Sequence, residues 1–255
     1  MKINRLVVKV GTSTLTYDTG KLNLQRIDRL ARVLTDLHNS GLEVVLVTSG
    51  SIAVGVEKLK LKERPSDIPM KQAAAAVGQC ELMSIYSKSF SEYGQVVAQV
   101  LLTHDAVEDE RLGHAVNTFS ALISQGVIPI VNENDTVSVE ELGFGDNDSL
   151  SAVVAKIVNA DLLVLLTDID GLYNGDPRVN PDATLIKRVE RIDSSIISMA
   201  GGNGTKRGAG GMKTKISAAI TATEAGIDMA IISGANPDGI QDLLDGAEIG
   251  TYFKA

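Results

Sequence analysis

Short apolar runs rich in β-branched residues recur along the chain and predict buried strands. These runs occupy residues 6–10, 44–49, 96–102, 127–131, 162–166 and 229–233. Between them the apolar residues have helical spacing, as in the segment that begins after the capping residue Asn23 and ends at Gly41. Continuous apolar strands that alternate with helices indicate a mainly parallel sheet covered on both faces. The pattern therefore predicts an α/β fold.

Three later segments, residues 140–148, 171–193 and 201–211, lack this regularity and are candidate binding loops. No fixed-period repeat or Pro/Ser-rich linker interrupts the 255 residues, so we expect one domain over residues 1–255. The placement of the motifs suggests a division of that domain near Asn159.

Polar residues follow the ends of four predicted strands. In an open parallel sheet, ligands bind beyond the carboxyl ends of the strands, so these positions are candidates for a site. Each alone is also what a turn requires, and their repetition favours a site. The four stretches are residues 9–13, 48–51, 132–135 and 167–168.

Lys9 interrupts an apolar strand, so its ammonium group must either reach solvent or meet an anion. The following Gly11-Thr12-Ser13 would let backbone amides approach a phosphate closely. Lysine beside such a loop favours a phosphate neighbour.

A glycine-rich segment, residues 201–211, leads into a predicted helix that contains Met212 and Ile216. Amides at a helix N-terminus bind phosphate oxygens, and Lys213 and Lys215 lie in its first turns. The alternative is a mobile surface loop with a solvated basic cluster. Lysine at this end opposes the helix dipole unless an anion is present, which favours the binding loop.

The residues Asp146-Asn147-Asp148 precede another helical pattern, and one of them is expected to cap it. A cap needs only one residue. The two remaining polar groups could orient lysines or a substrate that carries an ammonium group.

Composition narrows the class of protein. A net charge of −8 and only 4% aromatic residues argue against nucleic-acid binding. No segment resembles a signal peptide or a membrane span, and Cys80 is the only cysteine, so we expect a cytoplasmic protein without membrane attachment. Common nucleotide-loop and protein-kinase motifs are absent, and the three histidines do not have metal-ligand spacing.

Seven stretches together resemble the amino-acid kinase family, in the family's order and across nearly the whole chain. They are VVKVGTS (7–13), VTSGSIAVG (47–55), NENDTV (132–137), FGDNDSLSA (144–152), LLTDIDGLY (165–173), DPR (176–178) and GAGGMKTK (208–215). The resemblance implies a three-layer α/β/α sandwich. It also implies a phosphoryl acceptor held by about residues 1–159 and ATP held by about residues 160–255.

Within the family, the motifs are most similar to members that phosphorylate the side-chain carboxylate of L-glutamate, the first step of proline biosynthesis. The resemblance implies catalytic roles for Lys9, Asp148 and Lys215, with Asp148 holding the two lysines. The implied glutamate contacts are Ser49, Gly50, Asn132, Asp135 and Asn147. The implied nucleotide contacts are Lys9, Thr167, Asp168, Ala209, Gly210, Gly211, Met212, Lys213, Thr214 and Lys215.

The resemblance further implies Mg²⁺ carried by the ATP phosphates rather than a metal site of the protein. It also implies a homo-oligomer (dimer or tetramer), inhibition by proline and use of the product by a glutamyl phosphate reductase. The sequence departs from the usual family pattern at Ala209, which replaces the threonine of the nucleotide loop. We also expect a form of the protein without the PUA domain of many relatives.

Other readings stay open from the residues. Acetylglutamate, aspartate, carbamate or UMP could be the acceptor, although Asp135 favours a free ammonium group. A protein of another class, a non-catalytic sensor of nucleotide or amino acid, would not need Lys9, Asp148 and Lys215.

Overall fold

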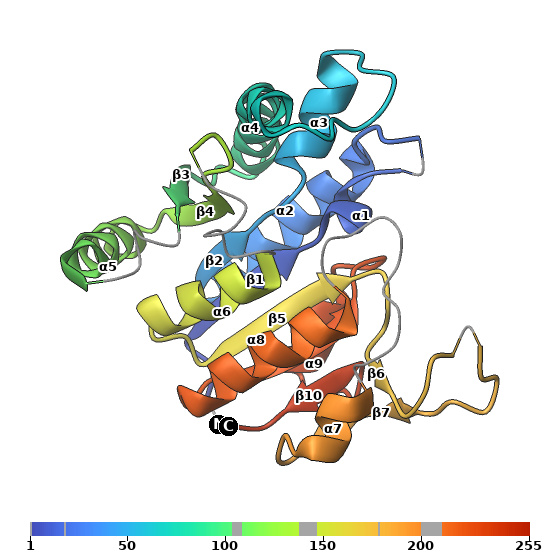
Figure 1. Cartoon of the computed structure of the whole chain (residues 1–255). Helices are drawn as coiled ribbons and strands as arrows, with labels where there is room; N and C mark the ends of the chain where they lie inside the picture. The colour runs from blue at the N-terminus through green and yellow to red at the C-terminus, as the bar shows by residue number, and fades with distance from the viewer. Residues whose placement is uncertain (1, 18, 104–108, 138–146, 178, 200–210) are drawn as a thin grey trace.

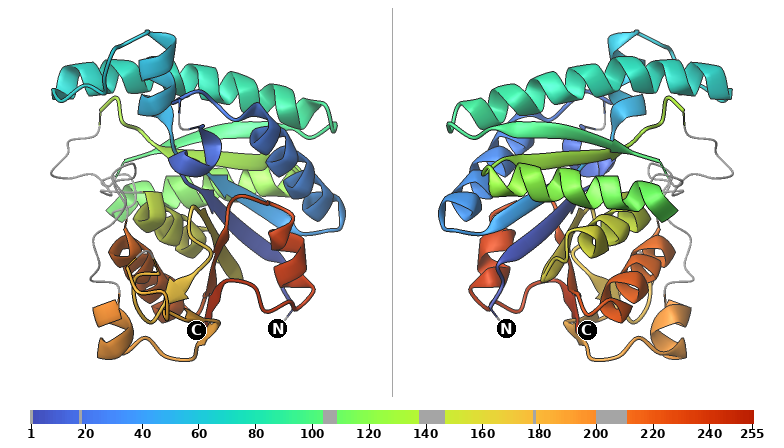
Figure 2. Two further views of the ribbon diagram at one scale, coloured as in Figure 1. Left: turned by 90° about the vertical axis from the view of Figure 1, so that its right-hand side faces the viewer. Right: turned by 90° about the vertical axis from the view of Figure 1, so that its left-hand side faces the viewer.

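The structure is a computed structural model that describes residues 2–17, 19–103, 109–137, 147–177, 179–199 and 211–255. Eight strands of the described residues form one sheet, which lies between layers of helices (Figures 1 and 2). In spatial order they are β3 (Val97–Leu102), β4 (Ile128–Glu133), β2 (Glu43–Val47), β1 (Arg5–Val10), β5 (Leu162–Thr167), β9 (Asp228–Ser233), β10 (Thr251–Phe253) and β8 (Arg188–Val189).

Six of these strands, from β3 to β9 in the spatial order, are parallel, and they correspond to the six apolar runs. The short β10 is antiparallel to β9 and parallel to β8. A separate antiparallel hairpin pairs β6 (Leu172–Tyr173) with β7 (Leu185–Ile186) inside the segment that showed no clear pattern. The predicted α/β fold with a mainly parallel sheet is confirmed.

Helices cover both faces of the sheet (Figure 2). The first face packs against α5 (Asp109–Ser124), α6 (Asn147–Ile157) and α8 (Met212–Glu224), with α7 (Ser194–Met199) at its margin. The second packs against α2 (Leu24–Asn39), α4 (Ile68–Ser91) and α9 (Gly239–Leu244). The remaining helices, α1 (Thr12–Leu15) and α3 (Ser51–Lys58), lie near the carboxyl ends of β1 and β2.

The alternation of side chains along β1 determines which face of the sheet carries Lys9. Leu6, Val8 and Val10 belong to the core cluster on the α2 face, whereas Val7 belongs to the cluster on the α6 face. Because side chains alternate along a strand, Lys9 lies on the same face as Val7. The lysine is therefore directed toward the layer that contains α6 and α8.

The structure also corrects details of the predicted elements. The stretch expected to be a phosphate loop, Gly11-Thr12-Ser13, is largely the start of the short helix α1, because the amides of Thr14 and Leu15 bond back to the Gly11 carbonyl. Strand β2 ends at Val47, two residues earlier than predicted, whereas β4 extends through Glu133. Asn132 is therefore a strand residue. Asn23 caps α2 as predicted, accepting a hydrogen bond from the Arg26 amide.

Candidate functional site

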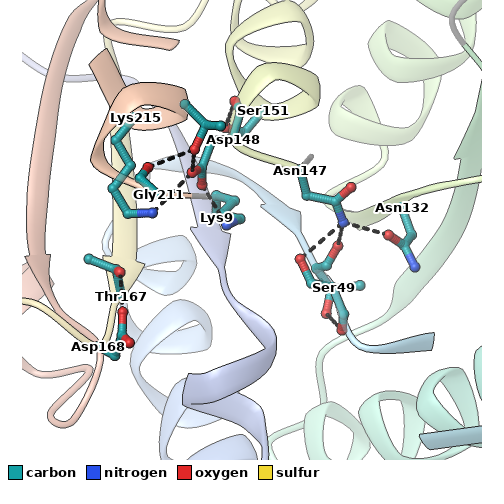
Figure 3. A network of polar contacts seen from close by, with 12 residues as sticks. Lys9, Ser49, Asn132, Asn147, Asp148, Ser151, Thr167, Asp168, Gly211 and Lys215 are labelled. Atoms are coloured by element: carbon teal, nitrogen blue, oxygen red, sulfur yellow. Dashed lines mark hydrogen bonds and ion pairs between the residues drawn. The ribbon is translucent and has the colours of Figure 1, made fainter. Parts of the chain in front are cut away.

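The predicted strand-end residues gather at one edge of the sheet. In the strand register, Lys9 of β1 pairs with Val47 of β2 on one side and with Leu165 of β5 on the other. Thr48, Asn132 and Thr167 therefore lie near the same level. The first turns of α6 and α8 reach this edge from the first face of the sheet (Figure 3).

Lys9, Asp148 and Lys215 form one buried cluster, as the resemblance implied (Figure 3). The Lys9 Nζ lies 2.5 Å from Oδ1 of Asp148, and the Lys215 Nζ lies 3.1 Å from Oδ2. The three residues are 8%, 1% and 6% exposed, respectively. One carboxylate thus holds two ammonium groups out of bulk water.

Three elements that are far apart in the sequence contribute to this cluster. Lys9 comes from β1, Asp148 from the first turn of α6 and Lys215 from the first turn of α8. A negative side chain in the first turn of α6 complements the positive end of that helix, and it also accepts a 2.9 Å hydrogen bond from Thr214 Oγ1. The helix termini and the ion pairs therefore support the same arrangement.

The charge state of Asp148 follows from this setting. Burial by itself would raise the pKa of its carboxyl group, but the nearby charges of Lys9 and Lys215 and their hydrogen bonds outweigh burial. The pKa of Asp148 accordingly lies below its ordinary value, and the group is an anion at neutral pH. One negative charge faces two positive ones, so the cluster retains an excess of positive charge for an anionic ligand.

The N-terminus of α8 adds uncapped donors to this positive region. Gly211 occupies the N-cap position in an extended conformation and provides no side-chain cap. The amides of the first helical turn can therefore donate to the oxygens of a bound anion. Lys213 in this turn is exposed, while Met212 and Thr214 are partly buried.

A second polar group lies beside the lysine cluster and is built from amide side chains. The Nδ2 of Asn147 lies within hydrogen-bond distance of the Thr48 carbonyl (2.5 Å), Ser49 Oγ (3.0 Å) and Asn132 Oδ1 (2.7 Å). Figure 3 shows these contacts converging on the nitrogen of Asn147. Asn147 and Asp148 are adjacent in α6. The first turn of this helix therefore fixes the amide group and the lysine cluster relative to each other.

Asp135 belongs to the same side of the site. Its Oδ2 accepts a 2.5 Å hydrogen bond from Ser51 Oγ in the first turn of α3. Burial is the largest influence on this carboxyl group and raises its pKa, with Glu133 adding to the rise, while Ser51 and Arg64 oppose it. A cationic group bound beside Asp135 would stabilise the ionised form of its carboxyl group, which burial disfavours.

Gly50 connects these contacts through its backbone. It precedes α3 with φ of 99°, a left-handed conformation that glycine adopts without strain. This turn places Ser49 against Asn147 and Ser51 against Asp135. Gly50 thus shapes the site although it carries no side chain.

Thr167 and Asp168 lie farther along the edge, at the end of β5, where Thr167 Oγ1 donates to Asp168 Oδ1 at 3.0 Å. In Figure 3 they lie on the opposite side of the lysine cluster from Asn147 and Asn132. The structure therefore places both residues near the lysine cluster. Ala209 and Gly210, like Asp146, lie outside the described residues.

Sequence reasoning missed Gln79, and it included Ser51 only as part of the strand-end stretch 48–51, without a role of its own. Ser51 bonds to Asp135, and Gln79 Oε1 accepts a 2.8 Å hydrogen bond from Asn132 Nδ2. Gln79 is 8% exposed within an alanine-rich helix. The sequence signal for Gln79 was a polar side chain among the alanines of a predicted helix. Its partner Asn132 could not be predicted, because it lies 53 positions away in the sequence.

Two features of the described residues bear on cofactors and membranes. Within them, no group of three or more histidine, cysteine, aspartate and glutamate side chains is arranged to hold a metal ion. None of the helices formed by the described residues has the length and apolar character needed to cross a bilayer.

Comparison with known proteins was consistent across sequence and structure. Residues 4–233 match the model of the amino acid kinase family. The chain is 57% identical to a glutamate 5-kinase of Clostridium perfringens, over 98% of this chain and 95% of that protein. It is 54% identical to a glutamate 5-kinase of Listeria monocytogenes, over 98% and 93% of the two chains.

Solved structures share the fold at low sequence identity. A carbamate kinase from Giardia lamblia bound to AMP-PNP aligns with a TM-score of 0.72 and 18% identity, over 98% of each chain. An isopentenyl phosphate kinase from T. acidophilum aligns with a TM-score of 0.69 and 20% identity, over 98% of this chain and 99% of that one. The family match over most of the chain, with relatives above half identity along nearly its full length, shows that the chain belongs to the amino acid kinase family.

Proposed function

We propose that this protein is a glutamate 5-kinase, which transfers the γ-phosphoryl group of ATP to the side-chain carboxylate of L-glutamate and forms L-glutamyl 5-phosphate. The observation that carries the proposal is the buried Lys9-Asp148-Lys215 cluster directly beside Asn147. The names of the most similar relatives, at 53–57% identity, support glutamate as the acceptor.

The acceptor side fits an amino acid with a free ammonium group. Asp135 offers a carboxylate and Asn147 belongs to a cluster of hydrogen-bonding groups, with Ser49 and the Gly50 turn between them. A cation near Asp135 would gain a charge-assisted hydrogen bond. We therefore assign Ser49, Gly50, Asn132, Asp135 and Asn147 to glutamate, held by the first half of the chain.

The donor side follows from the positive region around α8. We assign the α8 N-terminus with Lys9, Lys215, Thr167 and Asp168 to ATP, held by the second half of the chain. Ala209 and Gly210 complete this assignment on sequence grounds. The backbone amides of the first turn of α8 would bind phosphate oxygens without a threonine at position 209.

The chemistry needs no general base from the protein. A glutamate side chain has an ordinary pKa of about 4.3 and is already ionised at neutral pH. The protein must instead hold two anions together, in line, and stabilise charge on the transferring phosphoryl group. Lys9 and Lys215 would do so on either side of that group, while Asp148 keeps both ammonium groups in place.

Mg²⁺ is expected to arrive with ATP, where it would partly neutralise the charge of the phosphates. The donor set of the protein agrees with this division, because both oxygens of Asp148 already face ammonium or hydroxyl donors. A metal placed at Asp148 would be repelled by Lys9 and Lys215. Metal binding through the nucleotide avoids that conflict.

A direct test is ADP release with Mg·ATP and each acceptor in turn, with hydroxylamine present to trap any acyl phosphate. L-glutamate, acetylglutamate, aspartate, carbamate and UMP form the panel. We expect hydroxamate with L-glutamate and little with the other carboxylates. Faster turnover of UMP or acetylglutamate would overturn the assignment, and ATP binding without any turnover would favour a sensor.

The cellular setting is part of the same proposal. We expect a cytoplasmic homo-oligomer that supplies proline biosynthesis, with a glutamyl phosphate reductase consuming the labile acyl phosphate. Proline is expected to compete with glutamate, which initial rates at several concentrations of both would measure. Rates that ignore high proline would refute this regulation while leaving the catalytic assignment intact.

A further inference from the structure

We propose that Gln79 is a positioning residue for the substrate site, and that it sets the preference for an acceptor with a free ammonium group by fixing Asn132 and Asn147. The inference rests on the proposed function, because it concerns how the same site recognises glutamate. Gln79 comes from α4, an element to which no role in the reaction has been assigned above.

The side chains form a continuous line of amides. Gln79 Nε2 donates to Gln99 Oε1 at 3.1 Å, and Gln79 Oε1 accepts from Asn132 Nδ2 at 2.8 Å. Asn132 Oδ1 then accepts from Asn147 Nδ2 at 2.7 Å. The line thus runs from β3 through α4 and β4 to the first residue of α6.

Backbone groups fix the direction of this line. Asn147 must turn its NH₂ group toward the Thr48 carbonyl, because a carbonyl can only accept a hydrogen bond. Asn132 must turn its oxygen toward the Glu133 amide, which can only donate, at 2.9 Å. The NH₂ group of Asn132 then faces α4, and Gln79 is the residue that provides the acceptor there.

That acceptor matters because the line is buried. Asn132 is 2% exposed and Gln79 is 8% exposed. Without Gln79 Oε1, the Nδ2 of Asn132 would be buried without its acceptor, a state that buried polar groups avoid by rotating toward another partner. Rotation of Asn132 would remove one of the three acceptors that orient Asn147 and would loosen its orientation.

The consequence for recognition lies in the oxygen of Asn147. The nitrogen of Asn147 has two hydrogens to donate among the Thr48 carbonyl, Ser49 Oγ and Asn132 Oδ1. The side chain therefore presents Oδ1 to the other side, and no group among the described residues donates to that oxygen. An amide oxygen accepts hydrogen bonds and attracts an ammonium group, as does the neighbouring Asp135. Asn147 therefore favours an acceptor with a free ammonium group only while its orientation is held.

Close packing keeps Gln79 in place. A Cβ atom at the preceding Gly78 would lie 1.8 Å from the Ser51 carbonyl oxygen, so α4 meets the start of α3 backbone to backbone. Ser51 in turn holds Asp135. The two acceptors for an ammonium group are thus supported by one helix contact.

The test compares L-glutamate with glutarate, which has the same two carboxylates and no ammonium group. Gln79→Met removes the acceptor at nearly constant volume, and Gln79→Glu retains an oxygen for Asn132. The KM for L-glutamate and the inhibition constant of glutarate as its competitor are measured, together with the KM for ATP. Gln95→Met is the matched control, because Gln95 is 9% exposed and donates instead to the carbonyls of Val96 and Gly126.

In Gln79→Met we expect the KM for L-glutamate to rise about tenfold, while the glutarate constant and the KM for ATP change by less than about twofold. Gln79→Glu should recover most of the loss. Gln95→Met should lower thermal stability and leave the KM for L-glutamate unchanged.

Equal weakening of glutamate and glutarate, or an unchanged KM for L-glutamate, would overturn the inference. If Gln79→Met does not fold, the same constants are measured for Gln79→Asn, whose amide ends one methylene short of Asn132. The same changes are expected for this variant. A wild-type protein that forms no glutamyl hydroxamate would instead overturn the proposed function.

Discussion

Replacing Asp148 with asparagine tests the idea that one carboxylate keeps two lysines in a buried cluster. The side chain keeps its shape and loses its charge, which leaves Lys9 and Lys215 facing each other at 8% and 6% exposure. Removing one partner of a buried pair costs about 3–5 kcal/mol, because the remaining charge stays out of water. We take about 3 kcal/mol, since the cluster borders a polar site.

The loss should be visible in thermal unfolding. For a chain of this size, about 3 kcal/mol corresponds to a fall in Tm of about 6–12 °C. The misplaced lysines should also lower kcat by about 10²-fold or more. Because ATP phosphates supply negative charge, Mg·ATP should raise the Tm of Asp148→Asn more than it raises that of the wild type.

The matched control is Asp228→Asn. Asp228 is also buried, at 2% exposure, and it pairs with Lys254 at 2.9 Å and with the Tyr252 hydroxyl at 2.6 Å, but it lies at the amino end of β9. This variant should lose stability, keep its kcat within about twofold and gain no extra stabilisation from ATP. If Asp148→Asn retained wild-type Tm and kcat, the account of the cluster would be refuted.

Three further predictions concern the acceptor side. Burial raises the pKa of Asp135, so the KM for L-glutamate should rise as the pH falls through that raised pKa. In Asp135→Asn, the KM should be high at every pH. Initial rates measured across the pH range check both expectations. Gly50→Ala places a side chain at φ of 99° and should cost about 1 kcal/mol of unfolding free energy in urea titration, with a higher KM for L-glutamate. Gly78→Ala would place a Cβ 1.8 Å from the Ser51 carbonyl oxygen and should lower the free energy of unfolding by about 2 kcal/mol or more. A thermal scan should show this loss as a fall in Tm of several degrees.

Much of the fold could be predicted because local patterns carry it. The six apolar runs are continuous, as strands buried on both faces must be, and each became a parallel strand. The residues after these strands could be expected to share one edge of the sheet from topology alone. The short elements α1, α7, α9, β8 and β10 were not predicted, since a few residues show no period.

Contacts within the site were harder to predict, because they join residues far apart in the sequence. Lys9 and Asp148 are 139 positions apart, and only the family resemblance connected them. Gln79 had no such support, since its position depends on how closely α4 packs against α3. The stretch Gly11-Thr12-Ser13 was expected to resemble a phosphate-binding loop. The amides of Thr14 and Leu15 bond to the Gly11 carbonyl, so the stretch instead begins a helical turn.

The central claim is that Lys9 and Lys215 act on the transferring phosphoryl group rather than only on binding. The most direct measurement is kcat for Lys215→Met with saturating Mg·ATP and L-glutamate, with the amount of folded protein checked by thermal unfolding. Because Lys215→Met lacks one preorganised donor, we expect its kcat to be lower by about 10²-fold or more. The wild type should form glutamyl hydroxamate in the same assay. A Lys215→Met protein that turns over at the wild-type rate would contradict the account.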